Sequence, residues 1–150
     1  MVTINLAHSA PINPLGAHPV LTAAQAWAGL MHKARRPQDF VPVVSGCEIL
    51  SEAETSIEAI VYFEPGVAHA TTIRETCTLR APSRLDYDME DGSTATNIIS
   101  LGSSGNPEDL ILTFCFGWEH AGVEEGSQEA QDILSNHLNV LHGQKGSTIQ

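Results

Sequence analysis

A carboxylate in an otherwise apolar row of side chains is the feature of this sequence best suited to chemistry. Residues 70–81 have the composition of a strand, in which successive side chains point to opposite faces. Glu75 then shares one face with Ile73, Cys77 and Leu79. Because burial raises the pKa of a carboxyl group, Glu75 is a candidate general base near neutral pH. The alternative is that Glu75 lies near a sheet edge or bonds a neighbouring backbone group.

The last predicted strand, residues 110–120, carries aromatic side chains and a candidate acid. Alternation places Phe114, Phe116 and Trp118 on one face and, continued, adds His120 at its end. An imidazole there could exchange protons with a ligand near neutral pH. The alternative is that the strand ends earlier, which would leave His120 in a solvated loop.

A second candidate acid lies in the closing helix, which is expected to be capped by Ser127 and to run to about residue 141. The apolar stripe of this helix includes Leu134, and His137 falls within the stripe by the 3.6-residue count. A lone histidine in such a stripe is more often a packed core residue than a catalyst. Both interpretations stay open for His137.

Two further polar residues are candidates for holding a developing negative charge. Tyr87 shares its predicted inward face with Leu85 and Met89, where its hydroxyl could bind a ligand or could simply pack. Asn97 shares a face with Ala95 and could contribute a side-chain amide. The strand that carries Asn97 is apolar on both faces, so its pattern alone does not decide which face is inward.

The elements that must position these residues run in the order helix, strands, helix. A capping box of Thr22 and Gln25 opens the first helix, and Pro37 stops it. The period then changes to two, and strands are expected at residues 47–50, 57–63, 70–81, 85–90, 94–101 and 110–120, after a first strand at 2–9. Short links favour antiparallel neighbours. We predict one α+β domain over residues 1–150, in which a long C-terminal helix covers a curved antiparallel sheet and an apolar pocket.

Composition excludes several classes of partner. The 150 residues carry a formal net charge of −11, which argues against nucleic acid and anionic membranes. The basic run Lys33, Arg35 and Arg36 ends the first helix, where it is expected to complement the helix dipole. No apolar run is long enough to span a bilayer, and no signal-peptide pattern opens the chain. These features predict a soluble cytoplasmic protein.

Cysteines and histidines do not form a metal-binding pattern. Cys47, Cys77 and Cys115 include no C-x-x-C pair and are expected to be buried free thiols in a reducing compartment. The seven histidines show no zinc-ligand spacing. A phosphate loop, a dinucleotide fingerprint and a nucleophile elbow are also missing from the sequence, so we expect no metal and no cofactor.

A longer set of residues resembles a known family. The resemblance rests on Ile12-Asn13-Pro14, then Leu21-Thr22 with Gln25, Trp27 and Leu30, then Ala34-Arg35-Arg36-Pro37 with Phe40 and Pro42. This pattern is similar to a domain of unknown function in the START-like, or birch-pollen-allergen-like, superfamily (SRPBCC), which includes polyketide cyclases. Glu75, Asn97 and residues 110–116 match the later part of the pattern, so the similarity covers roughly residues 4–142.

The resemblance implies a helix-grip fold: a strand, helices, six more antiparallel strands and a long C-terminal helix over an apolar cavity. Fungal relatives of this type look like accessory enzymes of polyketide pathways. The resemblance therefore implies a cofactor-independent cyclase of secondary metabolism. Such an enzyme would bind a linear polyketide or polyene and close a ring in it, with lactonisation or dehydration giving a pyrone.

In that hypothesis Glu75 is the base, His120 or His137 is the acid, and Tyr87 or Asn97 holds the oxyanion. The expected substrate-binding residues are Tyr87, Asn97, Trp118, Phe114, Phe116 and Leu134. The rival hypothesis is a carrier for a lipid or another hydrophobic small molecule, which needs the same cavity but no chemistry. A protein-interaction domain that uses the outer face of the sheet is a third possibility. The oligomeric state is open, a homodimer included.

Overall fold

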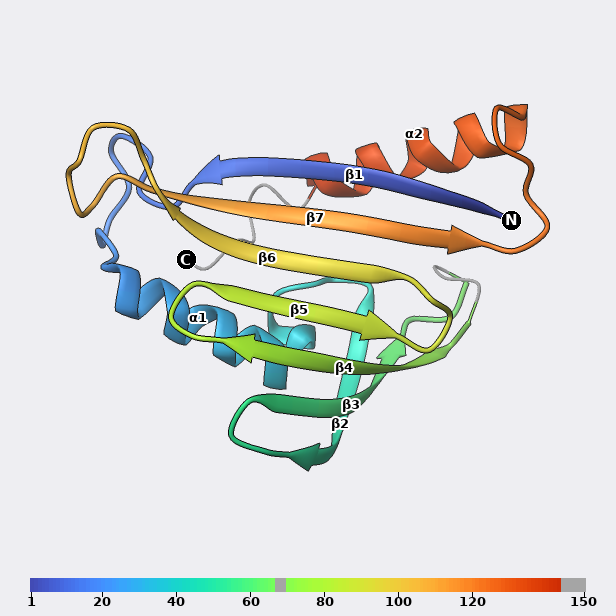
Figure 1. Ribbon diagram of the computed structural model, residues 1–150, viewed down its shortest axis with the longest axis horizontal. Helices are drawn as coiled ribbons and strands as arrows, with labels where there is room; N and C mark the ends of the chain where they lie inside the picture. The colour runs from blue at the N-terminus through green and yellow to red at the C-terminus, as the bar shows by residue number, and fades with distance from the viewer. Residues whose placement is uncertain (67–69, 144–150) are drawn as a thin grey trace.

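Seven antiparallel strands form one curved sheet, and two α-helices pack on it (Figure 1). The structure, a computed structural model, describes residues 1–66 and 70–143, with the side chains of the last helix described as far as residue 136. The elements are β1 (Val2–Pro11), α1 (Ala23–Arg35), the 3₁₀ helix η1 (Pro37–Asp39), β2 (Val44–Glu52), β3 (Ser56–Phe63), β4 (Thr72–Arg80), β5 (Arg84–Met89), β6 (Thr94–Leu101), β7 (Leu110–His120) and α2 (Gln128–Gly143). The strand order β1-β7-β6-β5-β4-β3-β2 confirms the predicted α+β helix-grip fold.

Helix α1 begins and ends where the sequence predicts. The Thr22 hydroxyl accepts from the Gln25 amide at 3.1 Å, and the Gln25 side chain accepts from the Thr22 amide at 2.9 Å. These two bonds are the predicted capping box, which satisfies two amide donors at the start of the helix. The helix ends before Pro37, which opens η1. Ala26 and Leu30 are fully buried on the face that meets the sheet.

The β5–β6 hairpin sets the register of the middle of the sheet. Gly92 has φ +88°, a backbone conformation that favours glycine, and Ser93 donates its amide to the Asp91 carboxylate at 2.8 Å. The turn leaves Tyr87 opposite Ala95. Tyr87 also pairs with Cys77 on β4, and Ala95 pairs with Phe116 on β7. These four side chains therefore form one row on one face of β4, β5, β6 and β7.

Both helices cover that same face, which we call the inner face. One core cluster joins α1 to β3–β7, and its buried members are Ile12, Ala26, Leu30, Ala34, Ile57, Cys77, Leu85, Tyr87, Ala95, Ile99, Leu110 and Leu112. A second cluster joins α2 to β1 and the end of β7, with Val2, Ile4, Val123 and Ala130 buried. Figure 1 accordingly shows α1 near β4 and β5, and α2 alongside β1. The inner face is thus covered by two separate patches of helix.

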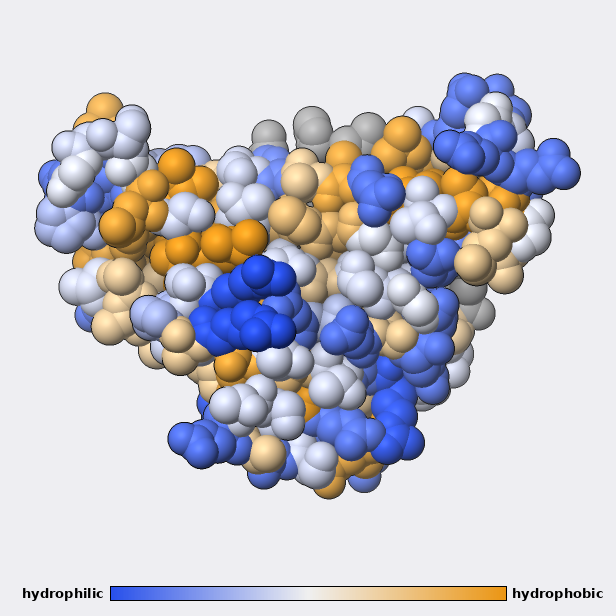
Figure 2. Space-filling model, viewed as in Figure 1, coloured by the Kyte–Doolittle hydropathy of each residue, from blue (hydrophilic) through white to orange (hydrophobic). Residues whose placement is uncertain are grey.

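The outer face is polar and held by ion pairs. The Asp86 carboxylate lies 2.6 Å from Arg80 and 2.8 Å from Arg84, and Arg74 pairs with Glu58 on β3. Figure 2 shows strongly hydrophilic side chains gathered over β4 and β5. Among the described residues, neither helix has the length and apolar character that crossing a bilayer requires.

Strand boundaries differ from the prediction by up to three residues, and two of the differences have a clear reason. Strand β2 begins at Val44, three residues before the predicted start, and its pairing with β3 shifts register at Val44/Gly46 and at Ile49/Ser51. Such bulges break the period of two, which is why the sequence pattern shows only part of the strand. Strand β1 extends to Pro11, because its ladder with β7 continues to the pair Pro11–Ile111. As an edge strand, β1 tolerates proline at its end.

Candidate functional site

Glu75 lies on the inner face in the middle of the sheet. Register places it opposite Ala59 on β3 and Met89 on β5, and its side chain is partly buried. Burial raises the pKa of Glu75 from 4.5 to about 7, and the positive charge of Lys33 opposes part of that rise. The carboxyl group is therefore present in both protonation states near neutral pH, as a general acid or base requires.

Lys33 reaches the inner face from the last turn of α1. Its ammonium donates to Oδ1 of Asn97 on β6 at 3.3 Å and lies 4.4 Å from the ring centroid of Phe114 on β7. Loss of water around the ammonium lowers the pKa of Lys33 from 10.5 to about 8, and the charge of Glu75 raises it in part. Lys33 is in the last turn of α1, as expected, and its side chain also reaches the sheet, which was not predicted.

The sequence contained a signal for this lysine that the prediction missed. Lys33 follows Leu30 by three residues and Ala26 by seven, so it lies on the buried face of α1. Its neighbours Arg35 and Arg36 point elsewhere and pair with carboxylates at the surface. A basic run at a helix end can thus divide between two faces of the helix.

Asn97 and Tyr87 are both buried beneath α1, with 2% and 8% of their surfaces exposed. Asn97 receives the Lys33 hydrogen bond, so the structure joins a predicted residue to one that was missed. The Tyr87 hydroxyl bonds the side chain of Cys77, which lies opposite it on β4. Burial raises the pKa of Tyr87 well above 10 and that of Cys77 to about 12. Tyr87 is therefore a protonated phenol already engaged by a protonated thiol.

The negative charge of Glu75 affects the pKa of several side chains around it. Besides its effect on Lys33, its carboxylate raises the pKa of Cys47, Cys77 and Tyr87, in each case after burial as the larger cause. The three cysteines are free thiols, and Cys77 alone among them is buried, in contrast to the expectation of three buried thiols. Within the described part of the chain, no group of three or more His, Cys, Asp and Glu side chains could hold a metal ion.

Three predicted binding residues form a row of stacked rings on β7. The Phe114 and Phe116 centroids lie 6.3 Å apart, and those of Phe116 and Trp118 lie 4.6 Å apart with the ring planes 7° from parallel. All three side chains are only partly buried. Phe114 and Phe116 pack against the α1 cluster, whereas Trp118 packs with Leu134 against the α2 cluster. The row thus connects the two helix-covered patches by an accessible apolar strip.

His120 is the last residue of β7, not part of a loop. It pairs with Val2 of β1, and its side chain is partly buried. Three strand spacings, about 14 Å along the sheet, separate β7 from β4. The structure therefore does not bring His120 into contact with Glu75, although both lie along one face. His137 falls in the part of α2 whose side chains lie outside the described residues.

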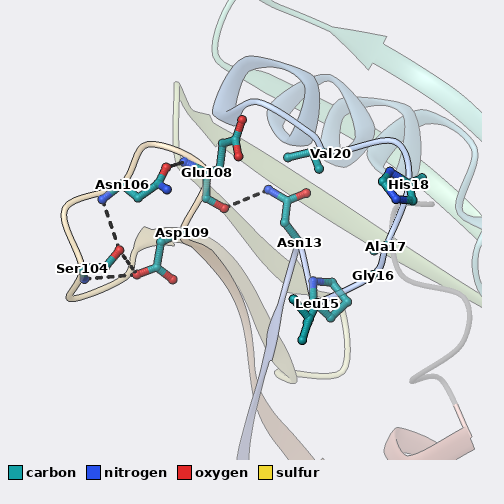
Figure 3. Close-up of a pocket in the computed structure, with 11 residues that line it drawn as sticks. Asn13, Leu15, Gly16, Ala17, His18, Val20, Ser104, Asn106, Glu108 and Asp109 are labelled. Carbon is teal, nitrogen blue, oxygen red and sulfur yellow. Dashed lines mark hydrogen bonds between the residues drawn. The ribbon is translucent and has the colours of Figure 1, made fainter.

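A pocket of about 360 Å³ lies away from this site, between the β6–β7 loop and the segment that joins β1 to α1 (Figure 3). The Asn13 side chain joins the two segments that border the pocket, because it donates to the backbone oxygens of Leu21 and Glu108 at 2.9 Å each. None of the predicted site residues whose side chains the structure describes lines this pocket. The apolar cavity expected between α2 and the sheet stays a prediction.

Solved structures of known proteins share this fold. The Zhui aromatase/cyclase from Streptomyces sp. R1128 matches with a TM-score of 0.63 at 15% identity, over 99% of this chain and 90% of that one. One half of the di-domain ARO/CYC StfQ from the steffimycin biosynthetic pathway matches with a TM-score of 0.67 at 12% identity, over 97% of this chain and 51% of that one. At these identities the likeness establishes the helix-grip fold alone.

Sequence comparison gives the family. The acetylaranotin biosynthesis cluster protein L of Aspergillus terreus is 25% identical over 150 residues, which cover 99% of this chain and 86% of that protein. The profile of the corresponding family matches residues 6–150. With this match over nearly its whole length, the chain belongs to the AtaL family, described as acetylaranotin biosynthesis cluster protein L.

Proposed function

We propose that the protein is a polyketide-cyclase-like enzyme of secondary metabolism, which binds an apolar carbonyl-containing chain on the inner face and promotes ring closure by proton transfer. The observation that carries the proposal is the position of Glu75. Its carboxyl has a pKa of about 7 and shares a face with the Lys33–Asn97 pair and the stacked rings of β7. The relative of this protein in Aspergillus terreus is named for a biosynthesis cluster, and the structural neighbours of this protein are named aromatase/cyclases.

The chemistry follows from the charges on this face. A carbon between two carbonyl groups loses a proton to the Glu75 carboxylate, which leaves a negative charge on a carbonyl oxygen. The Lys33 ammonium, held by the Asn97 amide oxygen, is the positive charge available to stabilise that oxygen. The stacked rings hold the remainder of the chain, so that its reacting ends stay close together.

The finer parts of the proposal are the second proton transfer and the ring. His120 lies at the far end of the aromatic row, where it would protonate a departing hydroxyl of an extended substrate. His137 is the alternative acid. Attack of an enol oxygen on the terminal acyl group would then close a pyrone, with thiol leaving from a thioester or water from a free acid. We also propose that the protein acts in the cytoplasm, with a hydrophobic polyketide as its substrate.

The polar groups on the inner face favour an enzyme over a carrier. A carrier for an apolar molecule needs apolar walls, and an ionisable carboxyl and an amine among them weaken binding of such a ligand. Glu75 and Lys33 both occupy that face with pKa values near neutrality. Perturbed pairs of this kind are concentrated at catalytic sites.

Turnover of a synthetic poly-β-keto thioester by purified wild-type protein and by the Glu75→Gln and His120→Ala variants tests the assignment. We expect Glu75→Gln to lower turnover on the order of a hundredfold or more, the contribution typical of a general base. Binding of an apolar fluorescent dye, which we expect both variants to retain, separates lost chemistry from lost folding. Full turnover in both variants would show the assignment to be wrong, and dye binding without any wild-type turnover would indicate a carrier.

A further inference from the structure

Lys33 differs from every other cation whose side chain the structure describes. The seven lysines and arginines of the chain comprise five arginines, Lys33 and Lys145, the last outside the described residues. Each arginine pairs with a carboxylate; the partners in order are Glu52, Asp39, Glu58, Asp86 and Asp86. Lys33 has no carboxylate oxygen within 4.0 Å among the described residues. Its amine therefore has no carboxylate in direct contact, and the charge of Glu75 favours its protonated form only in part.

The groups that do contact the amine hold it without neutralising it. Oδ1 of Asn97, at 3.3 Å, accepts a hydrogen bond from either the charged or the neutral amine. The Phe114 ring, 4.4 Å away at its centroid, is an apolar neighbour that attracts the ammonium only weakly, as a cation–π contact. Asn97 is itself buried and stands on a central strand of the sheet, so the nitrogen is aimed at a fixed place. That place adjoins the partly exposed aromatic row.

We propose that Nζ of Lys33 is a nucleophile that binds its substrate covalently, as an imine with a ketone or aldehyde carbonyl. The inference rests on the proposed function, because it names the substrate group on which the same inner face acts. It adds a bond that proton transfer by Glu75 alone does not require. An amine placed in an apolar site next to an acid–base group is the arrangement that imine-forming lysines use.

The step is balanced by the groups present. The lone pair of the neutral amine attacks the carbonyl carbon, a C–N bond forms, and the carbonyl electron pair moves to oxygen. A proton passes from nitrogen to that oxygen, and a second proton, for which Glu75 is the candidate donor, releases it as water and leaves a C=N⁺H group. The cationic nitrogen withdraws electrons, so the neighbouring carbon loses a proton to carboxylate and becomes an enamine that can close the ring. Addition of one water then frees the product and returns the amine.

A β-diketone with an apolar tail, nonane-2,4-dione, tests the proposal directly. A reactive lysine converts it, with loss of one water, into a conjugated enaminone that absorbs in the near ultraviolet. We expect one adduct on wild-type protein, whose mass increase is the diketone less water. Peptide mapping should place it on Lys33 and not on Lys145, the other lysine of the chain, or on the amino terminus.

The rate supplies a second readout. The pKa of about 8 leaves on the order of a hundredfold more neutral amine at pH 7.5 than an ordinary lysine has. Adduct formation should therefore be at least about tenfold faster than on Nα-acetyl-lysine amide and should level off as the pH passes about 8. Lys33→Arg keeps a cation and Lys33→Met keeps an unbranched chain, and both should abolish the adduct at this position.

The results separate this inference from the proposed function. The absence of a Lys33 adduct, or an adduct no faster than on the free lysine amide, overturns covalent capture. If Glu75→Gln still loses turnover of the poly-β-keto thioester in that case, the proposed function stands without the covalent step. A fast Lys33 adduct combined with unchanged turnover in Glu75→Gln supports covalent capture and removes Glu75 as the base.

Discussion

Replacing Glu75 by glutamine should stabilise the fold at alkaline pH while removing the proposed base. Folding raises the pKa of this carboxyl from 4.5 to about 7, which means that the folded state binds its proton more tightly than the unfolded state does. Stability from this residue is therefore complete below pH 4.5 and is lost as the pH rises through about 7. Glutamine never ionises, so the variant does not undergo that loss.

The size of the effect follows from the two pKa values. Each pH unit between them corresponds to about 1.4 kcal/mol of free energy. Glu75→Gln should raise the free energy of unfolding by about 3 kcal/mol at pH 8, by about 2 kcal/mol at pH 6 and by less than about 0.5 kcal/mol at pH 4.5. Any fixed difference in how the amide and the protonated acid pack is the same at all three values. The change of about 3 kcal/mol between pH 4.5 and pH 8 therefore isolates the buried charge.

Urea unfolding of both proteins at the three pH values measures this directly. Glu54→Gln, at an exposed carboxylate in the β2–β3 turn, is the matched control and should change stability by no more than about 0.5 kcal/mol at any pH. A stability difference for Glu75→Gln that does not vary with pH, or a loss of stability at pH 8, would refute the reasoning. Either result would mean that Glu75 is a solvated or well-paired carboxylate in the folded protein.

Three further substitutions test the elements that build the site. Lys33→Met removes the charge that lowers the pKa of Glu75, so that pKa should rise when the carboxyl is titrated by NMR; an unchanged pKa would mean that the two groups do not interact. Leu30→Ala removes a fully buried side chain of α1 and should lower the free energy of unfolding by about 2–5 kcal/mol in urea titrations. Thr22→Ala breaks the capping box and should lower it by about 0.5–2 kcal/mol, whereas Thr22→Ser should be nearly neutral; equal effects of the two would argue against a capping role.

The parts of the fold predicted correctly are those in which local rules act alone. The capping box begins helix α1 by bonds between residues three apart, so Thr22 and Gln25 are sufficient to place the start of the helix. Asp91 and Gly92 form a tight turn because the Asp91 carboxylate accepts from a nearby amide and Gly92 adopts a positive φ. On β4, a central strand without bulges, the period of two continues unbroken and gives the face of Glu75. Residues whose surroundings come from neighbours in sequence are the ones that a pattern can place.

The parts missed depend on contacts between distant segments. Spacing along α1 can place Lys33 on the buried face of the helix, but it cannot say which strand residues its amine meets. Those are Asn97 on β6 and Phe114 on β7, which come from distant parts of the chain. The face of Asn97 is fixed by its pairing with Leu85 through the hairpin, since its own strand is apolar on both sides. His120 is separated from Glu75 because two strands, β5 and β6, lie between β7 and β4. Alternation along one strand predicts which face a residue occupies but not how far it lies from a residue on another strand.

The direction of the two pKa shifts indicates why Glu75 and Lys33 occur together on this face. A stabilising ion pair would lower the pKa of its carboxyl group and raise that of its amine. Here burial outweighs the mutual attraction at both groups, so the carboxyl rises to about 7 and the amine falls to about 8. Each charged form is therefore disfavoured by the fold. Groups that destabilise the fold yet exchange protons near neutral pH support the catalytic role proposed for them.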